Sequence, residues 1–121
     1  MTSYSQLDGG PKLVLAAGIR TPMAKAGGAF AKENVAHLAA ITTRELLAQT
    51  GLPPETINEV ITGCVGQPFD QANVSRVIAL RSGIPQEVPA RTVARNCASG
   101  MEAVTTAAAN ILAGMGDTYI C

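Results

Sequence analysis

The feature that most constrains this sequence is the alternation of short apolar runs with longer stretches of helical periodicity. An apolar run at 13–17 precedes a helical stripe, and the same order recurs twice before residue 121. This pattern is typical of βαβ units, in which crossover helices join parallel strands. We therefore predict an α/β fold of order βαβαβαβ, with helices packed on a mostly parallel sheet.

The composition predicts an interior built from small side chains. Hydrophobic residues make up 47% of the 121 residues, but aromatic residues only 3%. Alanine, valine, isoleucine and leucine must therefore fill the interior, with close backbone approaches at glycine. A chain of this length buries about two-thirds of the surface that its unfolded form exposes, which is enough for one core.

The expected elements follow from periodicity and from helix start and stop signals. Asn34 predicts the N-cap of a first helix, which Gly51 and Pro53 end. Strands are expected at 13–17, 59–65, 90–95 and 117–121, and further helices at 73–81 and between the 96–101 segment and residue 113.

The first and third helices have recognisable stripes. In the first, apolar or small residues recur with helical spacing at Val35, Leu38, Ala39, Thr42 and Leu46. In the third, the expected apolar side consists of Met101, Val104, Thr105, Ala108, Ile111 and Leu112, opposite Ala103, Ala107 and Asn110. Because the third helix carries so little charge, we expect it to be buried nearly all round.

The charge pattern excludes several classes of partner. Nine basic residues balance nine acidic ones without a long run of either sign, so neither a nucleic acid nor a membrane partner is expected. The longest apolar stretch, near 13–17, is far shorter than the roughly 20 residues that span a bilayer. Residues 1–11 lack the features of a secretory signal, and we expect a flexible leader there, followed by a domain from 12 to 121.

The three cysteines are Cys64, Cys97 and Cys121. They are too few and too far apart for a disulfide scaffold or a zinc site, which favours a reducing cytoplasm. Cys64 and Cys121 are interpreted as small packing residues.

Cys97 differs because it lies where a predicted strand leads directly into a predicted helix. Backbone N–H groups and the positive end of the helix dipole stabilise a thiolate at such a position. The small neighbours Ala98 and Gly100 leave room for an acyl chain, and the same N–H groups could hold the oxyanion of a tetrahedral intermediate. A cysteine that merely fills space at the start of an alanine-rich helix fits these residues equally well.

Three motifs give the sequence a family resemblance. They are Arg20-Thr21-Pro22 with Lys25 and Gly27-Gly28, then Gly66-Gln67 leading to Asn73-Val74-Ser75-Arg76, and then Cys97-Ala98-Ser99-Gly100. In this order and at these separations, they resemble the N-terminal part of the thiolase family over residues 12 to 121. Two departures are the five residues from 68 to 72, where many thiolases are shorter, and Ser75, where alanine is commoner.

The resemblance implies an acyl-CoA C-acyltransferase. The expected reaction is thiolytic cleavage of a 3-ketoacyl-CoA or the reverse Claisen condensation of two acyl-CoA molecules, with Cys97 carrying the acyl group as a thioester. Acyl-CoA and CoA would be the substrates, and no metal or redox cofactor is implied. Two histidines and a second cysteine would come from a C-terminal half of the subunit that this sequence does not include.

The resemblance also implies a homodimer or homotetramer. Thiolases pair across a two-fold axis through the strand before the nucleophile, here 90–95, which would otherwise be an exposed edge. The apolar strand at 117–121 further suggests one piece of a longer polypeptide, with the rest of the thiolase subunit as its partner.

For several other polar residues and glycines, a structural role is favoured over a functional one. His37, the only histidine, lies outside any thiolase motif and is interpreted as a helix-surface or satisfied core residue. Arg20 and Lys25 are interpreted as solvated or ion-paired loop residues rather than ligands of a CoA phosphate. The Gly27-Gly28 pair lacks the spacing of a phosphate-binding fingerprint.

Two alternative functions remain at this stage. Ketoacyl synthases share the fold and also carry a nucleophilic cysteine after the third strand, although the Arg20-Thr21-Pro22 opening favours a thiolase. A non-catalytic thiolase-like binding protein would keep Cys97 as a packing residue only.

Overall fold

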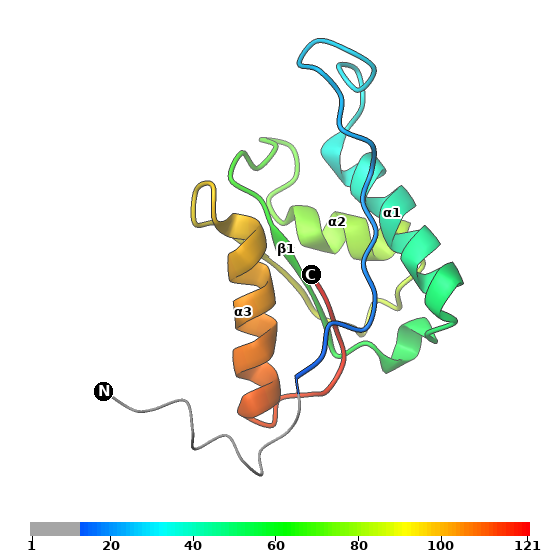
Figure 1. Ribbon diagram of the computed structural model, residues 1–121, viewed down its shortest axis with the longest axis vertical. Helices are drawn as coiled ribbons and strands as arrows, with labels where there is room; N and C mark the ends of the chain where they lie inside the picture. Colours follow the sequence, from blue (N-terminus) through cyan, green and yellow to red (C-terminus); the bar gives the residue numbers. More distant parts are fainter. Residues whose placement is uncertain (1–12) are drawn as a thin grey trace.

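The computed structural model describes residues 13–121, so the predicted leader at 1–11 lies outside the described residues. Figure 1 shows helices on either side of a small sheet. In chain order the elements are α1 (Val35–Thr50), the 3₁₀ turn η2 (Pro54–Thr56), β1 (Glu59–Gly63), α2 (Val74–Arg81), β2 (Ala90–Val93), α3 (Ser99–Leu112) and β3 (Tyr119–Ile120).

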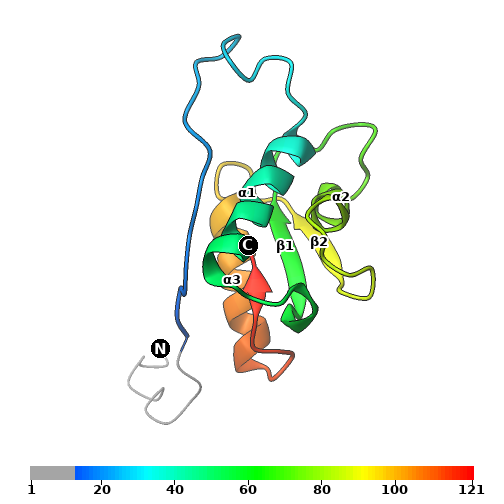
Figure 2. The same cartoon turned by 90° about the vertical axis from the view of Figure 1, so that its right-hand side faces the viewer.

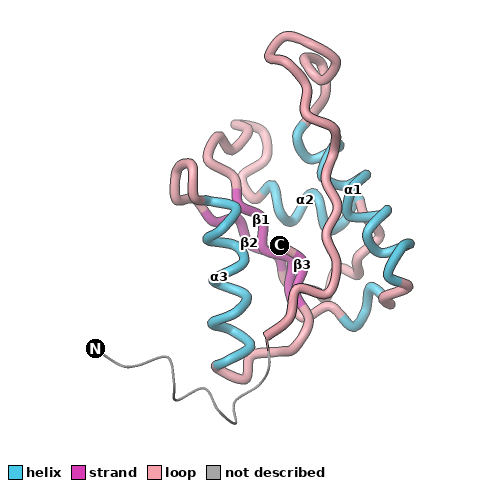
Figure 3. Tube along the Cα trace, in the orientation of Figure 1, coloured by secondary structure: helices cyan, strands magenta, loops and turns pink. Residues whose placement is uncertain are grey.

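The three strands form one parallel sheet in the order β2-β1-β3. Val60 in β1 is the register partner of both Ala90 in β2 and Ile120 in β3. Figure 3 shows the strands side by side between the helices. The predicted α/β class with a parallel sheet is therefore confirmed.

The two faces of β1 are covered by different helices. Val60 packs in a cluster with Leu47 of α1 and Ala79 of α2. The next residue, Ile61, packs against Ala103 and Ala107 of α3 on the opposite face. Since successive strand residues point to opposite faces, β1 is the buried centre of a three-layer arrangement. Figure 1 shows α3 on one side of the sheet and α1 and α2 on the other, and Figure 2 looks onto the sheet with α1 in front of α3.

The first predicted strand, at 13–17, does not form. Residues 13–34 contain no helix or strand, and Val14 and Leu15 are 78% and 86% exposed. A strand is stabilised by ladder hydrogen bonds, and residues 13–17 make none with β1, β2 or β3. The described order therefore begins with α1, and the predicted βαβαβαβ order is wrong at its first strand.

Helix α1 begins and ends where its signals predict. The Asn34 side chain accepts a hydrogen bond from the N–H of Ala36 at 2.9 Å, and Gly51 ends the helix at a φ of 65°. The buried face consists of Ala36, Ala40, Thr43 and Leu47. It lies one residue beyond the predicted stripe because the small alanines, rather than Val35, allow α1 to pack closely against α2.

Helix α3 presents the opposite face from the one predicted. Its buried residues are Ser99, Ala103, Ala107 and Asn110, whereas Met101 is 65% exposed and Leu112 is also exposed. The alanines let the helix approach Ile61, and the Asn110 amide donates to the Glu59 carboxylate at 3.3 Å. The predictions of the apolar side and of burial nearly all round were therefore wrong for the described chain.

The remaining elements differ from prediction mainly at their ends. Strands β1 and β2 stop at Gly63 and Val93, two residues earlier than predicted, and β3 is confined to Tyr119–Ile120. Helix α2 begins one residue after Asn73, which caps it. Within residues 13–121, no helix has the length and apolar character needed to cross a membrane.

Candidate active site

Cys97 lies in the tight turn that joins β2 to α3. The residue is exposed, and α3 begins two residues later at Ser99, with Ala98 as its N-cap. This turn follows the carboxyl end of a parallel strand, and Figure 1 shows it leading into α3. The structure thus places Cys97 at a strand-to-helix junction, as the sequence predicted, although α3 is buried along one face only.

The turn is bent sharply at the residue before the cysteine. Asn96 has a φ of 46°, which makes it the one non-glycine residue with positive φ in the part of the chain described here. Asparagine tolerates this left-handed conformation better than most residues, at a cost of about 1 kcal/mol or more. Backbone hydrogen bonds from Ala98 N–H to Arg95 O (2.9 Å) and from Ser99 N–H to Asn96 O (3.1 Å) close the turn.

The first turn of α3 offers free hydrogen-bond donors beside Cys97. Within residues 13–121, the N–H groups of Gly100 and Met101 donate no hydrogen bond. Unpaired N–H groups at a helix start carry a partial positive charge that favours an anion. The negative charge of Glu102 in the same turn is balanced by Arg95, whose guanidinium lies 3.0 Å from the carboxylate. The turn can therefore accommodate a thiolate or an oxyanion.

The end of β1 packs directly against the backbone at the start of α3. A Cβ built on Gly63 would overlap the carbonyl group of Ser99 and lie 2.6 Å from the backbone nitrogen of Gly100. The N–H of Cys64 donates to Val93 O at 3.0 Å, which keeps the ends of β1 and β2 together. A glycine at position 63 therefore lets α3 start directly against the sheet.

The Asn73-Val74-Ser75-Arg76 motif anchors α2 to the sheet and to the loop that precedes β2. The Asn73 amide caps α2 and donates to Ala90 O at 2.8 Å. Ser75 is fully buried, and its hydroxyl donates to Val60 O at 3.0 Å. The Arg76 guanidinium donates to the carbonyl oxygens of Val88 (2.8 Å) and Gln86 (2.6 Å). The motif positions elements, and its described contacts do not include Cys97.

Comparison with known proteins identifies the family. A family model described as "Thiolase, N-terminal domain" matches residues 13–121. The 3-ketoacyl-CoA thiolase of Chromohalobacter salexigens is 44% identical over 111 residues, which are 89% of this chain and 28% of that protein. The 3-oxoadipyl-CoA/3-oxo-5,6-dehydrosuberyl-CoA thiolase of Escherichia coli is 45% identical over 105 residues, or 85% of this chain and 26% of that protein.

This chain belongs to the thiolase family. Two solved structures agree with the assignment. The acetyl-CoA acetyltransferase of Bacillus anthracis has a TM-score of 0.73 and 35% identity over 77% of this chain and 24% of that one. The acetyl-CoA acetyltransferase of Syntrophomonas wolfei has a TM-score of 0.77 and 29% identity over 83% of this chain and 25% of that one. The thiolase chain thus spans about a quarter of the length of these relatives.

The other cysteines of this thiolase chain pack against helices. Cys64 is half-buried against Ala36, Val74 and Ile78. Cys121 is exposed as a residue, but its sulfur lies against α3 and donates to Ala103 O at 3.5 Å. This partial burial raises the pKa of the Cys121 thiol above its usual range, and the nearby Glu59 carboxylate adds to the increase.

The remaining candidates, Arg20, Lys25 and His37, do not join the site. The Arg20 guanidinium donates to the neighbouring Thr21 O at 3.0 Å, and Arg20, Pro22 and Met23 line a shallow, open hollow. His37 is exposed on α1, which fits the predicted helix-surface role. Among the described residues, no hydrogen bond or ion pair links Arg20, Lys25 or His37 to the Cys97 turn.

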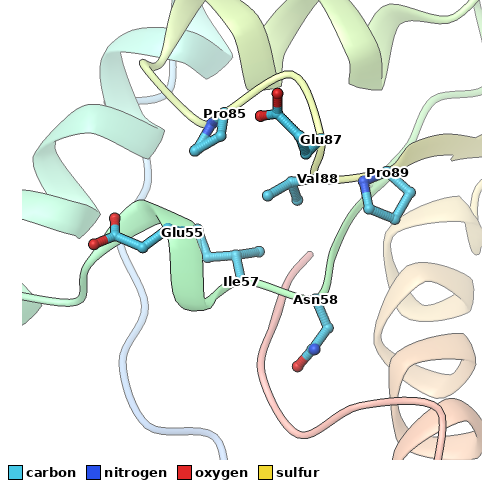
Figure 4. Close-up of a pocket in the computed structure, with 7 residues that line it drawn as sticks. All are labelled: Glu55, Ile57, Asn58, Pro85, Glu87, Val88 and Pro89. Atoms are coloured by element: carbon cyan, nitrogen blue, oxygen red, sulfur yellow. The ribbon is translucent and has the colours of Figure 1, made fainter.

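A groove of about 450 Å³ lies at the opposite end of the thiolase sheet. Its lining comes from residues before β1 and before β2, as Figure 4 shows: Glu55, Ile57, Asn58, Pro85, Glu87, Val88 and Pro89. Because Cys97 follows the carboxyl end of β2, this groove at the amino ends of the strands is separate from the candidate site.

Sequence reasoning singled out Cys97 as a candidate but missed two residues that shape its turn. Ser99 was named only as a member of the thiolase motif, without a role of its own, and Gly63 was not singled out. The available signals were a hydroxyl residue two positions after the cysteine and a glycine at the end of a buried strand. Their contact became visible only once β1 and α3 were placed against each other.

Proposed function

We propose that this chain is part of an acyl-CoA C-acyltransferase of the thiolase type and that Cys97 is its nucleophile. The observation that carries the proposal is the exposed thiol in a left-handed turn beside the unpaired N–H groups of Gly100 and Met101. Membership of the thiolase family supports it, since the relatives above are named as thiolases or acetyltransferases.

In the degradative direction, the Cys97 thiolate attacks the C3 carbonyl carbon of a 3-ketoacyl-CoA. A carbon–sulfur bond forms, and the carbonyl oxygen takes the negative charge, which the N–H groups at the start of α3 stabilise. As the carbonyl is restored, the C2–C3 bond breaks, and its electron pair stays on C2 of the leaving acetyl-CoA, which takes up one proton. The shortened acyl group remains on Cys97 as a thioester.

In the second half-reaction, the thiolate of CoA attacks this thioester carbonyl. A new acyl-CoA leaves, and Cys97 is released as a thiolate, so that atoms and charge balance over the cycle. The reverse sequence condenses two acyl-CoA molecules. The acid and base for these proton transfers are assigned, on the family resemblance, to two histidines and a cysteine outside this chain.

The proposal extends to assembly and location. We propose a homodimer or homotetramer in which β2 pairs with its symmetry mate, supported by the position of β2 at the edge of the described sheet. The remainder of the thiolase subunit would pack on the exposed face of α3. Three cysteines without disulfide partners among the described residues support a cytoplasmic location.

The decisive test of function is direct acylation. The full-length protein is incubated with acetyl-CoA in the absence of free CoA and is then digested. The mass of each cysteine-containing peptide is measured by mass spectrometry. We expect an acetyl group on the Cys97 peptide alone, and its removal when CoA is added. Cys64→Ala serves as the matched control and should be acetylated like the wild type.

Two results would contradict the proposal. Acetylation that is absent, or found equally on Cys64, would exclude the Cys97 thioester. Acylation from an acyl carrier protein but not from acetyl-CoA would instead indicate a ketoacyl-synthase type of condensing enzyme.

A further inference from the structure

One side chain is buried in an otherwise exposed segment. Ser99 is 4% exposed, while the residues around it, Cys97, Ala98 and Gly100, are all exposed. Polar groups that are buried in a folded protein are almost always hydrogen-bonded. The partners of this hydroxyl therefore indicate what it does.

The Ser99 hydroxyl connects the two residues that precede Cys97. It donates to the carbonyl oxygen of Asn96 at 2.7 Å and accepts from the N–H of Arg95 at 2.8 Å. Together with the backbone bonds of the turn, these contacts hold the residues on both sides of Cys97: Arg95 and Asn96 before it, and Ala98 and Ser99 after it. The left-handed conformation of Asn96 lies inside the same ring of hydrogen bonds.

These contacts are not those of an ordinary helix cap. A capping side chain precedes the helix and accepts from N–H groups in its first turn, as Asn34 does for α1. Ser99 is already inside α3, and it bonds backward to the turn and to none of the described N–H groups of the helix. Its hydroxyl therefore holds the turn rather than the helix.

We propose that Ser99 is a positioning residue that fixes the orientation of the Cys97 thiol relative to the free N–H groups of α3. This inference rests on the proposed thiolase function. Attack requires the thiol and the N–H donors to meet one reacting carbonyl, and an error of about 1 Å in such a geometry lowers a rate by about 100-fold. Loss of the hydroxyl frees Asn96 to leave its left-handed conformation, and Cys97 moves with it.

The test uses Ser99→Ala in the full-length protein, with Thr105→Ala as the matched control. Thr105 is an exposed residue of the same helix whose hydroxyl bonds only to the carbonyl oxygens of Met101 and Glu102. The rate of Cys97 acetylation is followed over a range of acetyl-CoA concentrations. We expect Ser99→Ala to acetylate about 10- to 100-fold more slowly at unchanged KM, because the substrate site is intact and only the attack geometry is lost. Thr105→Ala should match the wild type.

Ser99→Thr separates a positioning role from a purely structural one. It keeps the hydroxyl, so its acetylation rate should recover relative to Ser99→Ala at the same thermal stability. If Ser99→Ala fails to fold, Asn96→Ala tests the same turn at an exposed position. Alanine disfavours the positive φ of residue 96, and the Ser99 hydroxyl is retained in this variant. A rate reduced by 10-fold or more at unchanged KM is expected there as well.

The outcomes distinguish this inference from the proposed function. A folded Ser99→Ala or Asn96→Ala protein that acetylates at the wild-type rate would overturn the role of Ser99 and leave the thioester mechanism standing. A change confined to KM would also overturn it, because it would report substrate binding. A wild type that is never acetylated overturns the proposed function itself.

Discussion

Gly63, the last residue of β1, lies directly against the backbone of Ser99, the first residue of α3. A Cβ at position 63 would overlap the Ser99 carbonyl group, which cannot move without displacing the start of the helix. The same Ser99 closes the turn that holds Cys97. One glycine at a strand end thus sets how closely the candidate nucleophile approaches the sheet.

Gly63→Ala should lower the free energy of unfolding by about 1 to 3 kcal/mol, because the added methyl group meets backbone atoms rather than a flexible side chain. Gly66→Ala is the matched control, since a Cβ there meets nothing within 4 Å. Its stability should stay within about 0.5 kcal/mol of the wild type. Urea unfolding followed by circular dichroism measures both. Equal stabilities of the two variants would show that the contact is absent.

Cys97→Ala should reduce acyl transfer by about 1,000-fold or more, because the covalent route disappears with the thiol. The fold should be unchanged, since Cys97 is exposed and alanine is smaller. A thiolysis assay with a 3-ketoacyl-CoA measures the activity, and a melting curve checks the fold. Substantial activity in a folded Cys97→Ala protein would refute the nucleophile assignment.

Asn73→Ala should destabilise the protein more than Asn34→Ala, although both asparagines cap helices. Asn34 makes one side-chain bond to its helix, and its loss should cost about 1 kcal/mol. Asn73 also donates to Ala90 O and accepts from the Thr92 hydroxyl at 2.9 Å, so its loss should cost about 2 to 3 kcal/mol. Chemical denaturation of the two variants gives the comparison directly. The reverse order would mean that the bonds to β2 contribute little.

The three thiols should react with iodoacetamide in a fixed order at pH 8. Cys97 should react first because it is exposed, while packing slows Cys64. Cys121 should also react slowly, because its raised pKa leaves a smaller thiolate fraction at this pH. As the pH rises above the ordinary thiol pKa of about 8.5, the rate at Cys121 should continue to increase after that of an ordinary thiol has levelled off.

Peptide mass spectrometry at a series of pH values measures these rates. The control is the same protein in denaturant, where all three cysteines should react alike. A folded protein in which Cys121 titrates like a free thiol would contradict its burial against α3.

The sequence by itself determined the local features. The caps at Asn34, Gly51 and Asn73 were predictable because a cap depends on residues within one helical turn. The parallel α/β arrangement followed from the alternation of apolar runs and helical stripes, and the strand-to-helix position of Cys97 followed from its neighbours. The thiolase resemblance rested on short motifs of the same local kind.

Only the tertiary structure decided which surfaces meet. The alanine face of α3 packs on the sheet because small side chains let the helix reach Ile61, and a stripe of larger apolar residues in the sequence cannot show this. The segment 13–17 stays outside the sheet because it makes no ladder hydrogen bond with any of the three strands, which its apolar composition does not reveal. The contact of Ser99 with Gly63 joins residues far apart in the sequence, whose spacing carries no periodic signal. Local hydrogen bonds therefore shape the turn that holds Cys97, and packing between distant segments decides where this turn lies against the sheet.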